Sequence, residues 1–199
     1  MNEAPQIIST VEEACTVISD WFGWKNGFVG SQITLPFAVP QAIQTVNRRL
    51  GRLWLEDRHA RNVNIFDNQD TLISPHRYEA GPDGVVRMIR ENQDVWACGF
   101  KPETSTRLWV IGDWPDDQSG ASAWRPTQDV VDTAIIFVML ANAIWASADC
   151  QMDEEEKPAE VGRLLWTFAP WAGFSGFWTN TDQTLMRMQG LGWGITARR

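Results

Sequence analysis

The side chains best suited to catalysis or metal binding are sparse in this sequence. It contains two histidines, His59 and His76, and neither lies in an HExxH motif or in the HxE and CxxC arrangement of zinc deaminases. Each is expected to be a surface or hydrogen-bonded structural histidine. The three cysteines, Cys15, Cys98 and Cys150, are far apart and odd in number, which indicates reduced thiols in a cytosol rather than a disulfide framework or a zinc site.

Motifs for nucleophilic or phosphate chemistry are not found either. The glycine–serine segment 173–176 lacks the strand–turn–helix context of a nucleophile elbow, and no helix follows Gly190 and Gly192 to complete a dinucleotide site. Paired carboxylates occur at several places, but their polar surroundings favour a solvated surface over the burial that a general acid requires. We therefore expect a protein that is not an enzyme and has no catalytic residue, cofactor or bound metal.

Length and charge narrow the class of partner. The chain has 199 residues, enough for one domain whose core needs no disulfide or metal. Its net charge of −8 disfavours nucleic acid and anionic membranes and favours a basic partner, although solubility alone would also explain it. The N-terminus has no signal-peptide pattern, and the longest apolar stretch, residues 134–141, is far shorter than the about 18 residues of a membrane span. A cytoplasmic location is expected.

Hydrophobic periodicity predicts helices near the start of the chain. Apolar residues recur at helical spacing over residues 7–22, and a second helix is predicted from about Pro40 to Leu50, with Gly51 as its stop. Residues 52–77 are expected to form loops and one short strand. The 12 tryptophans are expected mostly in a core, where each indole N–H needs a partner, and an exposed one could contact a binding partner.

The rest of the chain alternates between strands and one apolar helix. Apolar runs at 85–90, 95–100 and 107–111 predict an antiparallel meander. A helix near residues 127–147, capped by Thr127, is apolar almost all round and is expected to be buried on the sheet. Beyond a charged connector at 153–158, a short helix is predicted at 161–168 and strands at 176–179, 185–188 and 193–197.

These elements predict an α+β fold. A central, largely antiparallel sheet would be flanked by N-terminal helices and by the buried helix near residues 127–147, with C-terminal strands. We expect a single domain over residues 1–199, with residues 1–34 as a helical leader and 35–199 as the core. The sequence leaves open whether the leader packs on the core, and it does not determine the oligomeric state.

Several short motifs follow one another in a fixed order along residues 35–197. They are Leu35-Pro36 followed by a helix closing at Leu50-Gly51-Arg52, Gln69-Asp70 with Leu72 and Ser74-Pro75, and Val85 to Phe100, in which Glu91-Asn92-Gln93 leads into Val95-Trp96. In these motifs and their order the chain resembles the SUKH superfamily, the Smi/Knr-like immunity proteins of bacterial polymorphic toxin systems. Many relatives carry an Asp-Pro-Pro run before the third strand, where this chain has residues 104–108. The subgroup, and hence the partner, is therefore left open.

The resemblance implies an α+β fold and a function in immunity against a cognate toxin, often a nuclease or deaminase. It also implies that there are no catalytic residues. Within the hairpin motif of Glu91, Asn92, Gln93 and Trp96, a carboxylate and two amides can cap free backbone groups and fix the strand register. This structural role is favoured over direct contact with a partner.

The expected mode of action is that an acidic surface docks on the basic active-site face of the toxin and masks it. The candidate contact residues, chosen from composition alone, are Asp113, Trp114, Asp116, Asp117, Asp153, Glu154, Glu155 and Glu156. Two other functions stay open. The same fold could serve as a scaffold or regulatory protein-interaction domain, or the Trp-rich C-terminal region at 171–178 could bind a carbohydrate or another small molecule.

Overall fold

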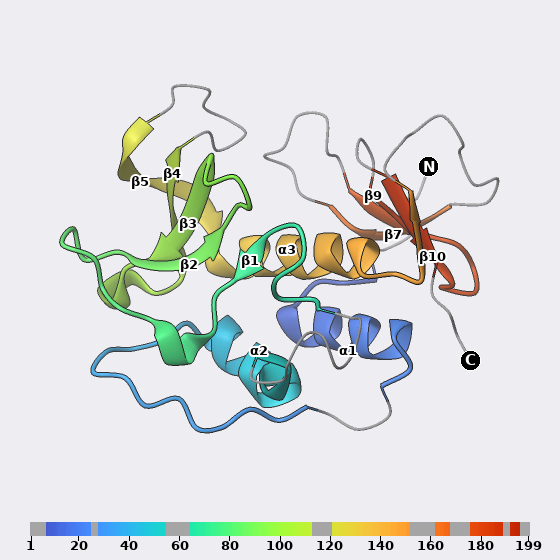
Figure 1. Cartoon of the computed structure of the whole chain (residues 1–199), viewed down its shortest axis with the longest axis horizontal. Helices are drawn as coiled ribbons and strands as arrows, with labels where there is room; N and C mark the ends of the chain where they lie inside the picture. The colour runs from blue at the N-terminus through green and yellow to red at the C-terminus, as the bar shows by residue number, and fades with distance from the viewer. Residues whose placement is uncertain are drawn as a thin grey trace.

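The computed structural model describes residues 7–24, 28–54, 64–112, 121–151, 162–167, 176–188 and 192–195. In these ranges the chain forms helices α1, α2 and α3 and two antiparallel five-stranded sheets (Figure 1). The predicted α+β class is confirmed, and its strands are divided between two sheets that lie toward opposite ends of α3 (Figure 1). No helix in the described ranges is long and apolar enough to cross a membrane.

The two N-terminal helices form where the sequence predicts them. Helix α1 (Val11–Trp21) begins at a capping box: the Thr10 hydroxyl accepts a hydrogen bond from the Glu13 N–H at 3.2 Å, and the Glu13 carboxylate accepts one from the Thr10 N–H at 3.0 Å. Helix α2 (Gln41–Leu50) starts after Pro40 and continues into the 3₁₀ turn η1 (Gly51–Trp54). Gly51 therefore tightens the helical path instead of ending it.

The leader packs on the core. Ile8 and the buried face of α1 belong to the same hydrophobic cluster as α2, α3 and both sheets. Upstream of α1, the backbone N–H groups of Ile7 and Ile8 donate to the carbonyls of Leu164 and Leu165 at 3.3 and 2.9 Å. The described part of the leader is thus held both by apolar burial and by hydrogen bonds to the second sheet.

The first sheet has the order β1-β2-β3-β4-β5. Its strands are β1 (Thr71–Leu72), β2 (Val86–Arg90), β3 (Trp96–Phe100), β4 (Arg107–Gly112) and β5 (Ala121–Val130), with 3₁₀ turns η3 (Pro75–Arg77) and η4 (Pro102–Thr104) in the connections. The predicted meander over β2, β3 and β4 is confirmed, and β1 is a short strand in the described part of residues 52–77.

The predicted start of the buried helix at Thr127 is wrong. Residues up to Val130 belong to β5, which pairs with β4, and the Thr127 hydroxyl donates to the Leu108 carbonyl at 3.3 Å instead of capping a helix. Helix α3 (Val131–Trp145) begins only where this pairing stops, and 12 of its 15 residues are buried because both sheets and both N-terminal helices pack against it. The expectation of a buried helix on the sheet is confirmed.

The second sheet has the order β6-β10-β9-β8-β7. Its strands are β6 (Asp149–Gln151), β7 (Arg163–Trp166), β8 (Phe177–Thr179), β9 (Leu185–Met188) and β10 (Gly192–Ile195). The predicted C-terminal strands are confirmed. The short helix predicted at 161–168 is wrong: residues 163–166 pair with β8, which turns Leu165 and Trp166 into the core.

Candidate functional site

The residues proposed from composition to contact a partner lie outside the described ranges. They are Asp113, Trp114, Asp116, Asp117, Asp153, Glu154, Glu155 and Glu156. The candidate site is therefore built from the motif residues and from the cavities of the described chain.

Glu91, Asn92 and Gln93 of the hairpin motif lie in the turn between β2 and β3, which we call the Glu91 turn. The Glu91 carboxylate accepts hydrogen bonds from the backbone N–H of Gln93 at 2.8 Å and of Val95 at 3.1 Å. The Glu91 N–H donates to the Trp96 carbonyl at 3.2 Å, which closes the hairpin. Asp94 occupies the left-handed region with φ 59°, a conformation that aspartate tolerates in turns. The Glu91 side chain thus organises the turn backbone, as its expected structural role requires.

The Gln69-Asp70 motif is held by a residue of α3 that the sequence analysis did not single out. Asn142 is fully buried, and its Oδ1 accepts from the N–H groups of Gln69 and Asp70 at 3.1 and 3.2 Å. Its Nδ2 donates to the carbonyls of Ile65 and Asp70 at 3.1 and 2.7 Å. The sequence signal that could have identified Asn142 is a single amide in a helix that is apolar almost all round. An amide buried in such a helix must find hydrogen-bond partners.

The Asp70 side chain connects the two motifs. Its carboxyl pKa is raised to about 7, mainly by burial and also by the neighbouring charge of Glu91, while a hydrogen bond from the Asn92 backbone N–H lowers it. The segments at 69–70 and 91–93 are therefore neighbours in space, although β1, η3 and β2 lie between them in sequence. A buried carboxyl with this pKa is a candidate for proton transfer wherever a substrate can reach it. Asp70 lines neither the cavity beside α2 nor the cavity beside η1 and β1.

The thiols are in settings that suppress their reactivity. Burial raises the pKa of Cys15 to about 12 and, together with the charge of Asp70, raises that of Cys98 well above its ordinary value. Such thiols stay protonated and are poor nucleophiles. His76 lies with its Nε2 3.0 Å from the Ser31 hydroxyl, and His59 falls outside the described ranges. The described residues contain no group of three potential metal ligands.

The Trp-rich tail places an arginine between two indoles in the register of the second sheet. Arg187 on β9 is paired with Trp178 on β8 and with Trp193 on β10. All three side chains are half-buried, and the indole N–H of Trp193 has no hydrogen-bond partner within the described part of the chain. The remaining Trp of the predicted aromatic groove, Trp171, lies outside the described ranges.

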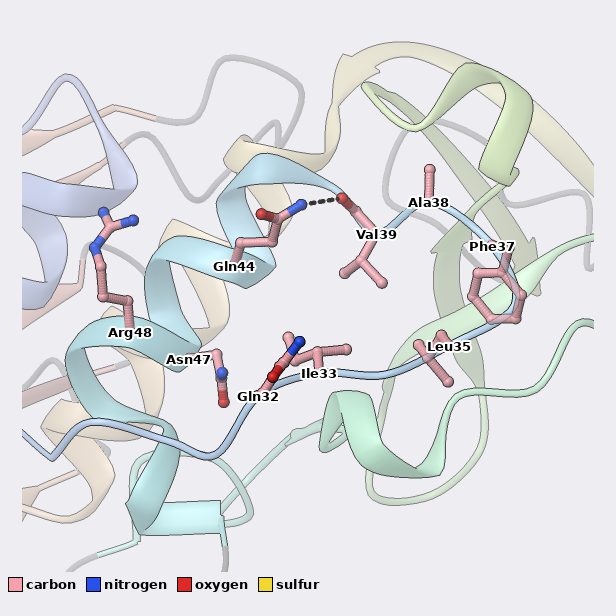
Figure 2. Close-up of a pocket in the computed structure, with 9 residues that line it drawn as sticks. All are labelled: Gln32, Ile33, Leu35, Phe37, Ala38, Val39, Gln44, Asn47 and Arg48. Atoms are coloured by element: carbon pink, nitrogen blue, oxygen red, sulfur yellow. Dashed lines mark hydrogen bonds between the residues drawn. The ribbon is translucent and has the colours of Figure 1, made fainter.

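A cavity of the described chain lies between α2 and the segment that precedes it (Figure 2). Its volume is about 430 Å³, within the range of about 300–1,000 Å³ typical of ligand sites. Its wall is formed by Gln32, Ile33, Leu35, Phe37, Ala38, Val39, Gln44, Asn47 and Arg48. We call it the α2 groove. It includes Leu35, so the first motif of the sequence resemblance contributes to this concave surface.

A smaller cavity of about 210 Å³ lies beside η1 and β1. Trp54 and Phe66 stack in its wall with ring centroids 4.2 Å apart, and the Trp54 indole donates to the Leu72 carbonyl at 2.9 Å. These contacts hold η1 against β1, so the residues of this cavity already serve the packing of the fold.

Comparison with known proteins does not identify a family or a function for the chain. The chain matches no family model, no curated protein and no solved structure.

Proposed function

We propose that this protein is a cytoplasmic immunity protein of the SUKH type, which binds a cognate toxin and masks its active site. The observation that carries the proposal is the junction of Asp70 with the Glu91 turn. Two motifs of the sequence resemblance meet there: the Asp70 carboxyl accepts a hydrogen bond from the Asn92 backbone N–H, and the Glu91 carboxylate accepts one from the Gln93 N–H. Asn142 of α3 holds the backbone of Asp70 from the other side. Because these motif residues stabilise the fold, they are consistent with a protein that acts by binding a partner.

The net charge supports a basic partner. Toxins that cleave or deaminate nucleic acids need a positively charged site for their substrate, and a chain of net charge −8 is attracted to such a surface. An inhibitory interface of this kind is expected to bury about 1,200–2,000 Å² in total. Neutralising Asp116, Asp117 and Glu154–Glu156 should slow association and weaken its salt dependence. Unchanged association kinetics would remove the electrostatic part of the proposal.

A growth competition in the native bacterial host tests the function directly. A strain lacking this gene should be inhibited by its parent in mixed culture, because the parent still delivers the toxin. Supplying the chain on a plasmid should restore growth, and deleting the neighbouring toxin-bearing gene from the parent should remove the inhibition. If the deletion strain competes equally with a parent shown to express the toxin, the immunity function is wrong.

A second candidate function rests on the row of Trp178, Arg187 and Trp193. The faces of two indoles on either side of a guanidinium could stack on sugar rings. Titration of the protein with a panel of oligosaccharides, followed by tryptophan fluorescence, tests this. Saturable quenching that disappears in Trp193→Ala favours a carbohydrate-binding module, whereas a flat response across the panel rejects it.

A further inference from the structure

The first sheet has one face on the hydrophobic core and one face turned away from it. On β4, Leu108 and Val110 are fully buried, so Trp109 between them points to the other face. The register pairs Trp109 with Gly99 on β3 and Gly99 with Arg87 on β2, and side chains at paired positions lie on the same face. We call this face the outer face of the first sheet.

Cationic side chains gather on the outer face. Arg90 is paired with Ala97, which alternates with Gly99 along β3 and therefore shares its face. Just beyond β3, the Lys101 ammonium lies 4.3 Å from the centre of the Trp109 ring. Together with Arg87 on β2, these residues place positive charge along two neighbouring strands.

The carboxylates of residues 86–112 lie in the connections between the strands. Glu91 and Asp94 belong to the Glu91 turn, where the Glu91 carboxylate already accepts hydrogen bonds from two backbone N–H groups. Glu103 lies in η4. The Asp94 carboxylate is 3.9 Å from an Arg87 nitrogen, and its side chain is 65% exposed. A surface ion pair of this kind contributes little, so Arg87 is only weakly neutralised.

The other cations of the outer face have no acidic partner. Arg90, Lys101 and Arg107 take part in no ion pair within the described part of the chain. Arg107 donates to a backbone carbonyl of β5 at 3.1 Å, a contact that leaves its positive charge uncompensated. The outer face is thus locally positive, although the whole chain has a net charge of −8.

Two indoles hold cations on this face without neutralising them. The ring of Trp109 lies under the Lys101 ammonium, and the guanidinium carbon of Arg87 lies 6.0 Å from the centre of the Trp124 ring on β5. An aromatic ring attracts a cation through its quadrupole but carries no net charge. The N–H donors of such a cation can therefore still bind a carboxylate.

We propose that the outer face of the first sheet binds an acidic segment of a partner protein, whose Asp and Glu side chains are held by Arg90, Lys101 and Arg107. Opposite charge on the two surfaces supplies the attraction and the selectivity. This surface is separate from the immunity function, because the basic active-site face of a toxin would be repelled by it.

An acidic protein segment fits the outer face better than a nucleic acid does. A cation already lies over each of the two indoles, where a base would have to stack. A long polyanion would also be repelled by the rest of a chain with net charge −8. A short acidic segment feels mainly the cations beside it, because salt screens charges that are more than about 8 Å away.

The test uses the full-length protein and random dodecapeptides displayed on phage. Enriched peptides are synthesised, and their Kd is measured by fluorescence anisotropy at low and at moderate NaCl concentration. A fluorescein-labelled oligothymidylate of the same length is the nucleic-acid probe. The variant Arg90→Gln/Lys101→Gln removes two charges from the outer face. The control Arg48→Gln/Arg163→Gln removes two charges from α2 and β7, so both variants have the same net charge.

Circular dichroism and thermal unfolding establish that both variants are folded. Selection on wild type should enrich peptides rich in Asp and Glu. Arg90→Gln/Lys101→Gln should bind them about fivefold to thirtyfold more weakly, with a smaller salt dependence, whereas the control should change Kd less than about twofold. The proposal is overturned if no peptide is enriched on wild type above the outer-face variant, or if both variants lose the same affinity. Tighter binding of the oligothymidylate than of any peptide would overturn it as well, because the ligand would then be a nucleic acid.

Discussion

The side-chain amide of Asn142, in the last turn of α3, hydrogen-bonds both backbone groups of Asp70. Its Oδ1 accepts from the Asp70 N–H at 3.2 Å, and its Nδ2 donates to the Asp70 carbonyl at 2.7 Å. The amide pairs with the N–H and C=O of Asp70 as a neighbouring strand would. The segment that enters β1 is therefore held by a helix and not by another strand. The position of the Asp70 carboxyl beside the Glu91 turn follows from that attachment.

Replacing Asn142 with leucine should strongly destabilise the protein. The apolar side chain is close in volume, but it leaves the N–H groups of Gln69 and Asp70 and the carbonyls of Ile65 and Asp70 without their buried partner. We expect a loss of about 3–5 kcal/mol in the free energy of unfolding, measured by urea denaturation. Asn180→Ala is the comparison, because Asn180 accepts from two backbone N–H groups in a half-buried turn and should cost about 1 kcal/mol. Equal losses for the two variants would argue against a special role of Asn142.

Asp70 should make the protein less stable as pH rises toward neutrality. Its pKa is about 7 in the folded state and 3.8 as the ordinary value, so between these values the folded state binds the extra proton. Its stabilising contribution is complete below pH 3.8 and is lost as pH rises through 7, with an upper bound of about 4 kcal/mol. Asp70→Asn should abolish this contribution and be more stable than wild type at pH 8.

Unfolding by urea at several pH values between 4 and 8 measures this effect as the difference between wild type and Asp70→Asn. Glu91→Gln provides a second check. Because burial is the main cause of the raised pKa and the charge of Glu91 is secondary, this variant should reduce the pH dependence and not abolish it. A difference between wild type and Asp70→Asn that does not change with pH would contradict the raised pKa.

Local sequence patterns were sufficient to predict the elements that carry their own hydrophobic periodicity and turn residues. The amphipathic helices α1 and α2, the hairpin of β2 and β3, and strands β8 and β9 each carry their own periodicity and turn residues. β5 carries no such pattern: residues 121–130 include Pro126 and Asp129 and become a strand because β4 pairs with them. A proline is tolerated there because β5 is an edge strand. β7 likewise depends on its pairing with β8.

The candidate site was predictable only in part, for the same reason. Glu91 sits in the turn that it organises, so its role could be inferred from neighbouring residues. The contact of Asp70 with the Glu91 turn depends on Asn142, which holds the Asp70 backbone. Asp70 and Asn142 are 72 positions apart in the sequence. No local pattern encodes such a contact. The α2 groove needed the structure as well, because its walls come from α2 and from the irregular segment that precedes it.

Glu91→Ala should loosen the β2–β3 turn. The carboxylate accepts from the N–H groups of Gln93 and Val95, and alanine removes both hydrogen bonds. Since the site is only half-buried, we expect a loss of about 1 kcal/mol in the free energy of unfolding. Amide hydrogen exchange at residues 93 and 95 should accelerate more than elsewhere in the sheet. Gln93→Ala, in the same turn, changes an exposed side chain and should stay within about 0.5 kcal/mol of wild type. A Gln93 effect as large as that of Glu91 would contradict the capping role.

Gly30→Ala should destabilise the protein by blocking the close approach of two backbone segments. A Cβ at Gly30 would lie 2.9 Å from the Cα of Gly51 and would also press on the buried Asn47 side chain, which anchors the Ser31 carbonyl. Neither backbone can move away easily, because Gly30 N–H donates to the Asn47 carbonyl at 2.8 Å. We expect a loss of about 1–3 kcal/mol in urea unfolding.

Gly162→Ala is the matched control for Gly30→Ala, since a Cβ at Gly162 meets no atom of the described chain within 4 Å. Its free energy of unfolding should therefore stay within about 0.5 kcal/mol of wild type. Gly51→Ala should reproduce the loss seen for Gly30→Ala, because its Cβ would lie 2.9 Å from the Cα of Gly30. A tolerated alanine at both positions would mean that the segment can move away from α2.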